Sequence, residues 1–360
     1  MIPFKKRIPY GRHSLDDNDI QAVVDVLKSD SHITQGQTVE DFGSALANYT
    51  GAKYGVAVAN GTSALHISVA SLNIGHGDEV ITTPNSFIAS TGAIVLAGAT
   101  PVFCDVGDDQ NLDPNLLEAV ITSRTKAIII NTPNNPTGKV FSEDELGIIA
   151  RLCQQWNVVA ITDEIYEHII YDGAEHVPMA TVDGMADQTI TINSLSKTFS
   201  VTGWRVGWAI APPALAGAIR KVHDFLTVGA AAPLQEAGAA ALSSSDTYYA
   251  ELAAAYQRRR DMLLEILERH GFVCYYPRGA YYIMTDIAHF GAADDVTFAR
   301  QLVTDVGVAS VPGSSFYHDP ALGRTKVRFC FCKRDETLRE ADRRLAKMAE
   351  TKFALVSEGT

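Results

Sequence analysis

Residues 189–210 read TITINSLSKTFSVTGWRVGWAI. Two apolar runs in this segment, 189–192 and 205–210, have the length and composition of buried strands. The connection between them carries Ser194 and Lys197, and Arg205 stands at the start of the second run. The segment therefore predicts two neighbouring strands joined by a polar connection that contains a lysine.

The same kind of pattern extends toward the N-terminus. From Tyr54 to about Ile210, short β-branched runs alternate with helix-like stretches, which is typical of strands joined by crossover helices in a mostly parallel sheet. The expected strands are 55–59, 79–83, 101–105, 126–130, 158–162, 189–192 and 205–210, and the expected helices are 62–72, 88–97, 114–121 and 143–155. Ser142 and Glu145 have the spacing of a capping box, which supports the start of the last helix.

The character of the chain changes after Pro212. An Ala-rich helical stretch is followed by a long amphipathic helix, 251–270, by strand-like stretches at 281–287 and 327–331, and by a final helix, 335–348. The sequence thus predicts an α/β fold. We expect a large domain over 45–245, and a smaller α+β domain formed by 246–360 with an N-terminal arm, 1–44.

Polar residues follow several of the expected strands. They are Gly61 and Thr62, Asn135, Asp163 and Tyr166, and Ser194 and Lys197. Ligands of open α/β sheets bind outside the carboxyl ends of the strands, so these residues are the first candidates for a site. Each has an ordinary interpretation when taken alone: a lysine is usually a surface ammonium, an Asp after a strand a helix N-cap, and an Asn before proline a turn residue.

Three motifs in this order are less easily explained by those ordinary roles: 134–138 (NNPTG), 163–166 (DEIY) and 194–197 (SLSK). With them, the sequence resembles the fold-type-I pyridoxal-phosphate enzymes, and from about Lys126 onward it resembles the class I/II aminotransferases of the aspartate, aromatic and kynurenine type. The resemblance implies a homodimer that uses pyridoxal 5'-phosphate, which Lys197 holds as a Schiff base. It assigns the phosphate to Ser194 and Arg205, the pyridine nitrogen to Asp163, and the phenolic oxygen to Tyr166 and Asn135.

The chemistry of such a cofactor explains these residue types. An anionic Asp163 keeps the pyridine nitrogen protonated, so that the ring can accept electrons. Lys197 has to be neutral in order to bind the cofactor and then to carry a proton as general base and acid. Arg205 can grip the phosphate, and we expect the N–H groups of Gly61, Thr62 and Ser63 at a helix start to assist.

Arg328 lies in the apolar strand-like stretch 327–331, where a charge is costly unless it meets an anion. It matches the family arginine that binds the substrate α-carboxylate, and we expect Asn135 to contact the substrate as well. The alternative is an arginine paired with a structural Asp or Glu. The predicted substrates are an amino acid and a 2-oxo acid.

The N-terminal portion, from Ile8 to about Asp105, instead resembles sugar aminotransferases of the same fold type. The likeness is carried by the residue runs 9–12, 34–36, 62–66, 83–87 and 111–114. Phe87 matches the aromatic residue that stacks on the pyridine ring. Tyr10, Tyr281 and Tyr282 are candidates to line an apolar or aromatic substrate pocket.

Three other functions remain open from the sequence. A pyridoxal-phosphate lyase or cyclase acting on an amino acid would begin with the same proton abstraction by Lys197. A nucleotide-sugar aminotransferase would agree with the N-terminal resemblance, although Arg328 favours an amino acid. A non-catalytic regulator on this fold is normally fused to a DNA-binding module, for which residues 1–8 leave no room.

Composition and charge argue against several partners. The net charge of −12 disfavours nucleic acid, and we interpret the Arg258–Arg259–Arg260 run as a solvated helix face. The small-apolar stretch 225–242 is interrupted by polar residues and does not predict a membrane span. The five cysteines and ten histidines show no spacing typical of a metal site or a disulfide framework. We therefore expect no bound metal. No targeting segment is evident, so we expect a cytoplasmic protein.

Overall fold

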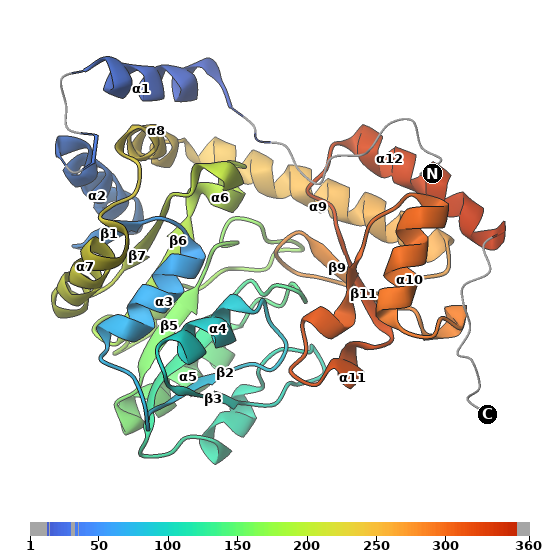
Figure 1. The fold of residues 1–360 in the computed structure, drawn as a ribbon, viewed down its shortest axis with the longest axis horizontal. Helices are drawn as coiled ribbons and strands as arrows, with labels where there is room; N and C mark the ends of the chain where they lie inside the picture. Colours follow the sequence, from blue (N-terminus) through green and yellow to red (C-terminus); the bar gives the residue numbers. More distant parts are fainter. Residues whose placement is uncertain (1–12, 14, 30–32, 35, 351–360) are drawn as a thin grey trace.

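The computed structural model describes residues 13, 15–29, 33–34 and 36–350, with side chains given up to residue 348. Tyr10 and the run 9–12, which belong to the predicted N-terminal arm, lie outside these residues. The chain forms two sheets, a seven-stranded one and a four-stranded one, with helices packed around both (Figure 1). The α/β fold class is therefore as predicted.

The seven-stranded sheet has the order β1-β7-β6-β5-β4-β2-β3. Its strands are β1 (Gly55–Val58), β2 (Glu79–Thr82), β3 (Thr100–Phe103), β4 (Thr125–Asn131), β5 (Val159–Asp163), β6 (Thr189–Ser194) and β7 (Gly207–Ile210). Strands β3, β2, β4, β5 and β6 pair in parallel, whereas β7 pairs antiparallel with both β1 and β6. The sheet is mostly parallel, and β7 is the strand that runs against the others.

Helices cover both faces of this sheet. The helices of this part of the chain are α1 (Asp17–Lys28), α2 (Gln37–Thr50), α3 (Gly61–Ser71), α4 (Ala89–Leu96), α5 (Glu143–Trp156), α6 (Leu195–Thr198), α7 (Pro213–Thr227) and α8 (Ala232–Leu242), of which α1 packs mainly on α8. One apolar core joins α3, α4 and α7 to the sheet, a second joins α5, and a third joins α2 and α8 to β7. The predicted capping box of Ser142 and Glu145 is present at the start of α5. The helix expected at 114–121 is a 3₁₀-helix, Pro114–Ala119.

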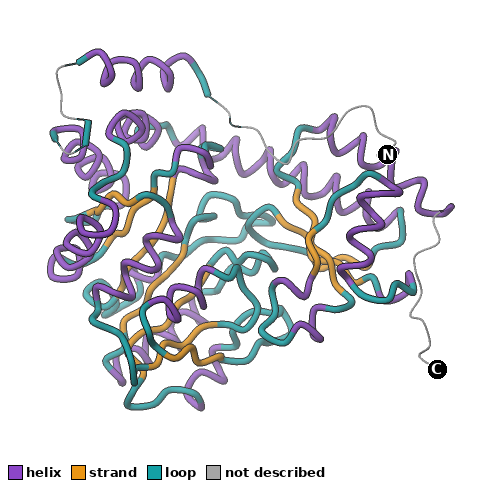
Figure 2. The backbone as a smooth tube through the Cα atoms, viewed as in Figure 1, coloured by secondary structure: helices purple, strands orange, loops and turns teal. Residues whose placement is uncertain are grey.

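The four-stranded sheet has the order β10-β11-β9-β8 and is antiparallel. Its strands are β8 (Val273–Tyr275), β9 (Tyr282–Asp286), β10 (Val311–Pro312) and β11 (Lys326–Cys330), and its helices include α10 (Asp295–Gln301), α11 (Pro320–Gly323) and α12 (Asp335–Leu345). Figure 2 shows the two groups of strands as separate orange clusters. The long helix α9 (Asp246–Arg269) leads from one cluster toward the other (Figure 1).

The prediction that the Arg258–Arg259–Arg260 run is solvated was wrong for its last residue. Arg260 is buried, and its guanidinium donates to Asp172 and Asp261 and to the carbonyl oxygen of Pro277. It stacks over the ring of Tyr171 as well. Asp261 is its neighbour in α9, but the other two acceptors are tertiary, because Asp172 lies in a loop after β5 and Pro277 lies before β9.

The predicted domain boundaries remain a prediction. Two related facts are visible: the boundary at 44/45 falls inside α2, and the boundary at 245/246 coincides with the start of α9. No described helix is both long and apolar enough to cross a membrane.

Candidate active site

A cavity of about 500 Å³ opens at the carboxyl ends of β4, β5 and β6. Its volume is within the usual range for small-molecule sites. It brings together ten of the eleven residues that the sequence assigned to the cofactor or to the substrate carboxylate, namely Gly61, Thr62, Phe87, Asn135, Asp163, Tyr166, Ser194, Lys197, Arg205 and Arg328. Of the two described pocket candidates, Tyr282 lines the cavity and Tyr281 does not. Ser63 does not line it, because its N–H faces the Asn60 side chain and donates to Asn60 Oδ1 at 2.9 Å.

Lys197 stands in the short helix α6, directly after β6. Ser194 begins this helix, and its side chain accepts a hydrogen bond from the Ser196 N–H at 3.2 Å. Burial lowers the pKa of Lys197 below its ordinary value, the charges of Arg328 and Arg205 act in the same direction, and Asp163 opposes them. Lys197 therefore loses its proton more readily in the folded protein than a lysine in water would.

Asp163 is the last residue of β5 and lies beside Asn131 of β4. Its carboxylate accepts a hydrogen bond from the Ile165 N–H at 3.4 Å. Burial raises the pKa of Asp163 to about 6, against the opposing effects of that hydrogen bond and of Lys197. A cation placed beside this carboxyl group would restore its charge.

Tyr166 and Asn135 approach the cavity from two loops. The Asn135 N–H donates to Asn131 Oδ1 at 2.7 Å, and Tyr166 is 2 % exposed. The turn that holds Asn135 closes at Gly138, whose φ is +74° and where an added Cβ would overlap Pro277. The glycine of the NNPTG motif is therefore needed both for the turn and for its close contact with the segment before β9.

Backbone N–H groups at a helix start and the Arg205 side chain also line the cavity. Helix α3 begins at Gly61 and Thr62, and its first N–H groups lie where a helix attracts anions. Arg205 donates from Nη1 to the Thr202 carbonyl oxygen at 2.7 Å. Ser194, Ser196 and Thr202 also line this region. The chemistry of the donors suits a phosphate group.

Phe87 lies at the mouth of the cavity and is 46 % exposed. Its N–H donates to the Asn135 carbonyl oxygen at 3.0 Å. The neighbouring Ile88 is 68 % exposed and lines the cavity too. Two apolar side chains beside the cavity are thus exposed to solvent.

Arg328 extends from β11 into the cavity and is buried. Its Nη1 donates to Asn135 Oδ1 at 2.5 Å, and Nε has no hydrogen-bond partner among the described residues. The guanidinium lies over the rings of Tyr282, at 3.9 Å from the ring centre, and Phe316, at 4.5 Å. A buried guanidinium with an unpaired nitrogen at a cavity wall is suited to bind a carboxylate.

Comparison with known proteins agrees with this geometry. Residues 11–345 match the family described as aminotransferase class I and II. The chain belongs to this family. It is therefore a transaminase, an enzyme that moves an amino group between an amino acid and a 2-oxo acid. The match begins at residue 11, so it covers all but the first three residues of the portion, 8–105, for which a likeness to sugar aminotransferases was expected.

This aminotransferase is similar in sequence and in structure to several named aminotransferases. A probable N-succinyldiaminopimelate aminotransferase of Mycobacterium tuberculosis is 41% identical over 286 residues, which are 76% of this chain and 72% of the relative. Human kynurenine–oxoglutarate transaminase 1 is 37% identical over 308 residues, covering 76% and 72%. The solved structure of the M. tuberculosis N-succinyldiaminopimelate aminotransferase superposes with a TM-score of 0.86 at 34% identity, over 94% of this chain and 92% of that one. Thermus thermophilus aspartate aminotransferase with maleate has a TM-score of 0.83 at 30% identity, over 94% and 90%.

The structure of the aminotransferase adds residues that the sequence analysis did not assign to the site. Asn131 donates to the Asp163 carbonyl oxygen at 3.0 Å and positions Asn135, as described above. Tyr282, named only as a pocket candidate, contacts both Tyr166 and Arg328. Asn131 ends a strand as Asp163 does, and that position was the available signal. Nothing in the sequence indicates the pairing of Tyr282 with Tyr166.

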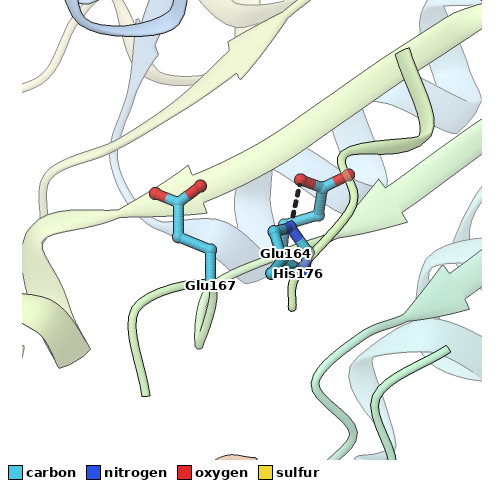
Figure 3. Close-up of side chains that lie close together, drawn as sticks. All are labelled: Glu164, Glu167 and His176. Atoms are coloured by element: carbon cyan, nitrogen blue, oxygen red, sulfur yellow. Dashed lines mark hydrogen bonds and ion pairs between the residues drawn. The ribbon is translucent and has the colours of Figure 1, made fainter. Parts of the chain in front are cut away.

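A second cluster begins at Glu164, the residue that follows Asp163 in the chain. Glu164, Glu167 and His176 come together closely enough to ligate a cation (Figure 3). His176 Nε2 and Glu164 Oε2 are 2.8 Å apart, and Glu167 accepts hydrogen bonds from Asn193 at 2.7 Å and Tyr49 at 2.8 Å. Because these carboxylates already have protein partners, we interpret the cluster as support for the ends of β5 and β6. The absence of a bound metal stays a prediction.

Proposed function

We propose that this aminotransferase uses pyridoxal 5'-phosphate in the cavity described above. The residues present fit that group. Asp163, a carboxyl group that would regain its charge beside a cation, lines the same cavity as a lysine whose pKa is lowered and a helix start with an arginine. Lys197 would hold the cofactor covalently, and Asp163 would bind its pyridine nitrogen.

The other lining residues would contact different groups of the cofactor. Gly61, Thr62, Ser194 and Arg205 would hold the phosphate, and Phe87 would cover one face of the ring. Tyr166 and Asn135 would donate hydrogen bonds to the phenolic oxygen. The Ser63 N–H is already bonded to Asn60, so its contribution is the stability of the helix start.

When bound, the cofactor supplies an electron sink that acidifies the Cα–H bond of an amino acid. Lys197 is the group that moves the proton, because it stands in the cavity as a weakened base. The anionic form of Asp163 keeps the pyridine nitrogen protonated. Arg328 orients the substrate through its α-carboxylate, so that the bond to be broken faces the lysine.

We propose neutral or aromatic amino acids as the preferred donors. The cations that line the cavity are Lys197, Arg205 and Arg328, and each already has a role. The other lining side chains include the apolar or aromatic Ile88, Ile165, Val311, Phe316 and Tyr282, together with uncharged polar ones such as Ser315. A second carboxylate on the substrate would therefore meet no unassigned cation of the described chain.

We propose a cytoplasmic homodimer. The apolar side chains of Phe87 and Ile88 are exposed at the mouth of the cavity, and a second subunit would remove them from water. Sedimentation should give about twice the mass of one 38.9 kDa chain. An active monomer would contradict the proposal.

Visible absorbance tests the proposed cofactor. The purified protein should show a visible band that converts to the band of the amino form of the cofactor when a neutral amino acid is added. The original band should return when a 2-oxo acid is supplied. Absence of any band after incubation with pyridoxal phosphate would refute the cofactor assignment. A band that ignores all amino acids but responds to an amino sugar nucleotide would refute the substrate class.

A donor panel tests the preferred side chain. It should contain phenylalanine, methionine, kynurenine, glutamate, aspartate and N-succinyldiaminopimelate, each with 2-oxoglutarate or pyruvate as acceptor. We expect the highest kcat/KM with a neutral or aromatic donor. A strict requirement for aspartate or for N-succinyldiaminopimelate would contradict the proposal that Lys197, Arg205 and Arg328 are all used by the cofactor and the α-carboxylate.

Replacing Arg328 by leucine should weaken the binding of both substrates. The loss of a buried, hydrogen-bonded charge pair costs about 2–5 kcal/mol, so we expect KM for the amino acid to rise roughly 30- to 5000-fold, with a smaller change in kcat. Arg328→Lys should retain part of the affinity, because the charge remains but the planar fork is lost. Unchanged KM values in Arg328→Leu would show that the carboxylate binds elsewhere.

A further inference from the structure

Tyr282 occupies a position between the two halves of the site. It begins β9, is 4 % exposed and lines the cavity. Its hydroxyl oxygen lies 3.0 Å from the hydroxyl oxygen of Tyr166, which follows β5 of the large sheet. Its ring lies 3.9 Å from the guanidinium carbon of Arg328 on β11. One side chain therefore contacts both the expected cofactor end and the expected substrate end.

The register of the small sheet explains this double contact. Strands β9 and β11 pair antiparallel with Tyr282 opposite Cys330, so Arg328 is its diagonal neighbour. Side chains opposite or diagonal to one another in this way share one face of the sheet. Tyr282 and Arg328 on that face line the cavity together with Tyr166, which lies in the loop after β5.

The proton arrangement of the two phenols matters for the chemistry. Each hydroxyl has one proton, and either oxygen can be the donor in this pair. Burial raises the pKa of Tyr166 well above its ordinary value, so Tyr166 stays neutral. If Tyr166 donated its proton to Tyr282, it would have none left for a partner in the cavity.

We propose that Tyr282 is a positioning residue: its hydroxyl donates to Tyr166 so that the single Tyr166 proton points into the cavity, and its ring holds the Arg328 guanidinium in the plane that receives the substrate carboxylate. This inference rests on the proposed function, because it assumes that Tyr166 donates to the cofactor. It assigns two separable roles to the hydroxyl and the ring.

Tyr282→Phe tests the hydroxyl role, since the ring remains. The readout is a spectroscopic pH titration of the holoenzyme without substrate. Tyr166 should then donate less strongly to the bound cofactor, so the pH of the visible absorbance transition should rise by about 0.3 to 1 unit. The KM for the amino acid should change less than about twofold, because Arg328 keeps its ring contact.

Tyr282→Leu tests the ring role. Loss of the stacked ring should raise KM by roughly 3- to 30-fold in addition to the spectral shift. Tyr276→Phe is the matched control, because Tyr276 is 64 % exposed and its hydroxyl contacts Glu268 at the surface. That variant should leave both readouts unchanged. Melting of the cofactor-free proteins shows whether each variant is folded.

The outcomes separate this inference from the proposed function. If the wild-type protein has no visible band, the proposed function fails first. If the band is present and Tyr282→Phe leaves its pH transition in place, the hydroxyl role is refuted. If Tyr282→Leu folds and keeps the wild-type KM, the ring role is refuted.

Discussion

Replacing Lys197 by alanine is expected to stop amino transfer. Loss of a general acid–base group lowers kcat by roughly 10²- to 10⁴-fold, and here the same residue is also proposed to hold the cofactor, so the loss should be at the upper end. Lys197 has this position because β6 ends at Ser194 and α6 begins directly after it. No other lysine lines the cavity among the described residues. The measurement is single-turnover conversion of an amino acid, followed by absorbance.

The controls for this prediction are a second lysine and an added amine. Lys126→Ala changes an exposed lysine near the start of β4, at the end of the sheet away from the site, and should leave kcat unchanged. A small primary amine in solution should restore part of the proton transfer in Lys197→Ala. A Lys197→Ala protein that binds the cofactor covalently and turns over at the wild-type rate would refute the site assignment.

Replacing Asp163 by asparagine should lower kcat/KM roughly 30- to 5000-fold. Removing one member of a buried hydrogen-bonded charge pair costs about 2–5 kcal/mol, and the neutral amide cannot hold the pyridine nitrogen protonated. The exposed Asp187 provides a control, since Asp187→Asn removes an equal charge far from any partner in the cavity. Near-wild-type kcat/KM in Asp163→Asn would exclude the proposed ion pair.

The same substitution should act in the opposite direction on the cofactor-free protein. The pKa of Asp163 is about 6 in the folded chain, above its ordinary value of 3.8, because burial disfavours the anion. The protonated form is therefore the one that favours folding, and that stability is lost as the pH rises through about 6. Asp163→Asn should raise the melting temperature of the cofactor-free protein at pH 8 more than at pH 5. An equal effect at both pH values would contradict the raised pKa.

The predicted elements agree with the structure to within a few residues wherever the pattern is local. The seven strands of the large sheet and the helix after Ser142 illustrate this, because alternation and capping depend on neighbouring residues. The segment 114–121 was harder to predict, since a proline-initiated turn fits both an α-helix and the 3₁₀-helix that forms. The antiparallel direction of β7 was not predicted, because strand periodicity is the same in both directions.

The candidate site shows the same division. Lys197, Asp163 and Asn135 were found because each follows a strand, and the ends of parallel strands meet at one edge of the sheet. The expected N–H of Ser63 was misplaced because a side chain three residues earlier caps it. The burial of Arg260 was not predicted either, because its partner Asp172 is 88 residues away in the sequence.

By itself, the sequence determined which groups are available for the chemistry, and the order of its strand-end motifs indicated where the lysine, the carboxylate and the phosphate-binding helix start would meet. Local pattern suffices for this, because those residues stand at the ends of strands in one sheet. Only the tertiary structure decided how the substrate end is built. Arg328 meets Asn135 across 193 residues and Tyr282 meets Tyr166 across 116, and such contacts depend on how the small sheet packs on the large one.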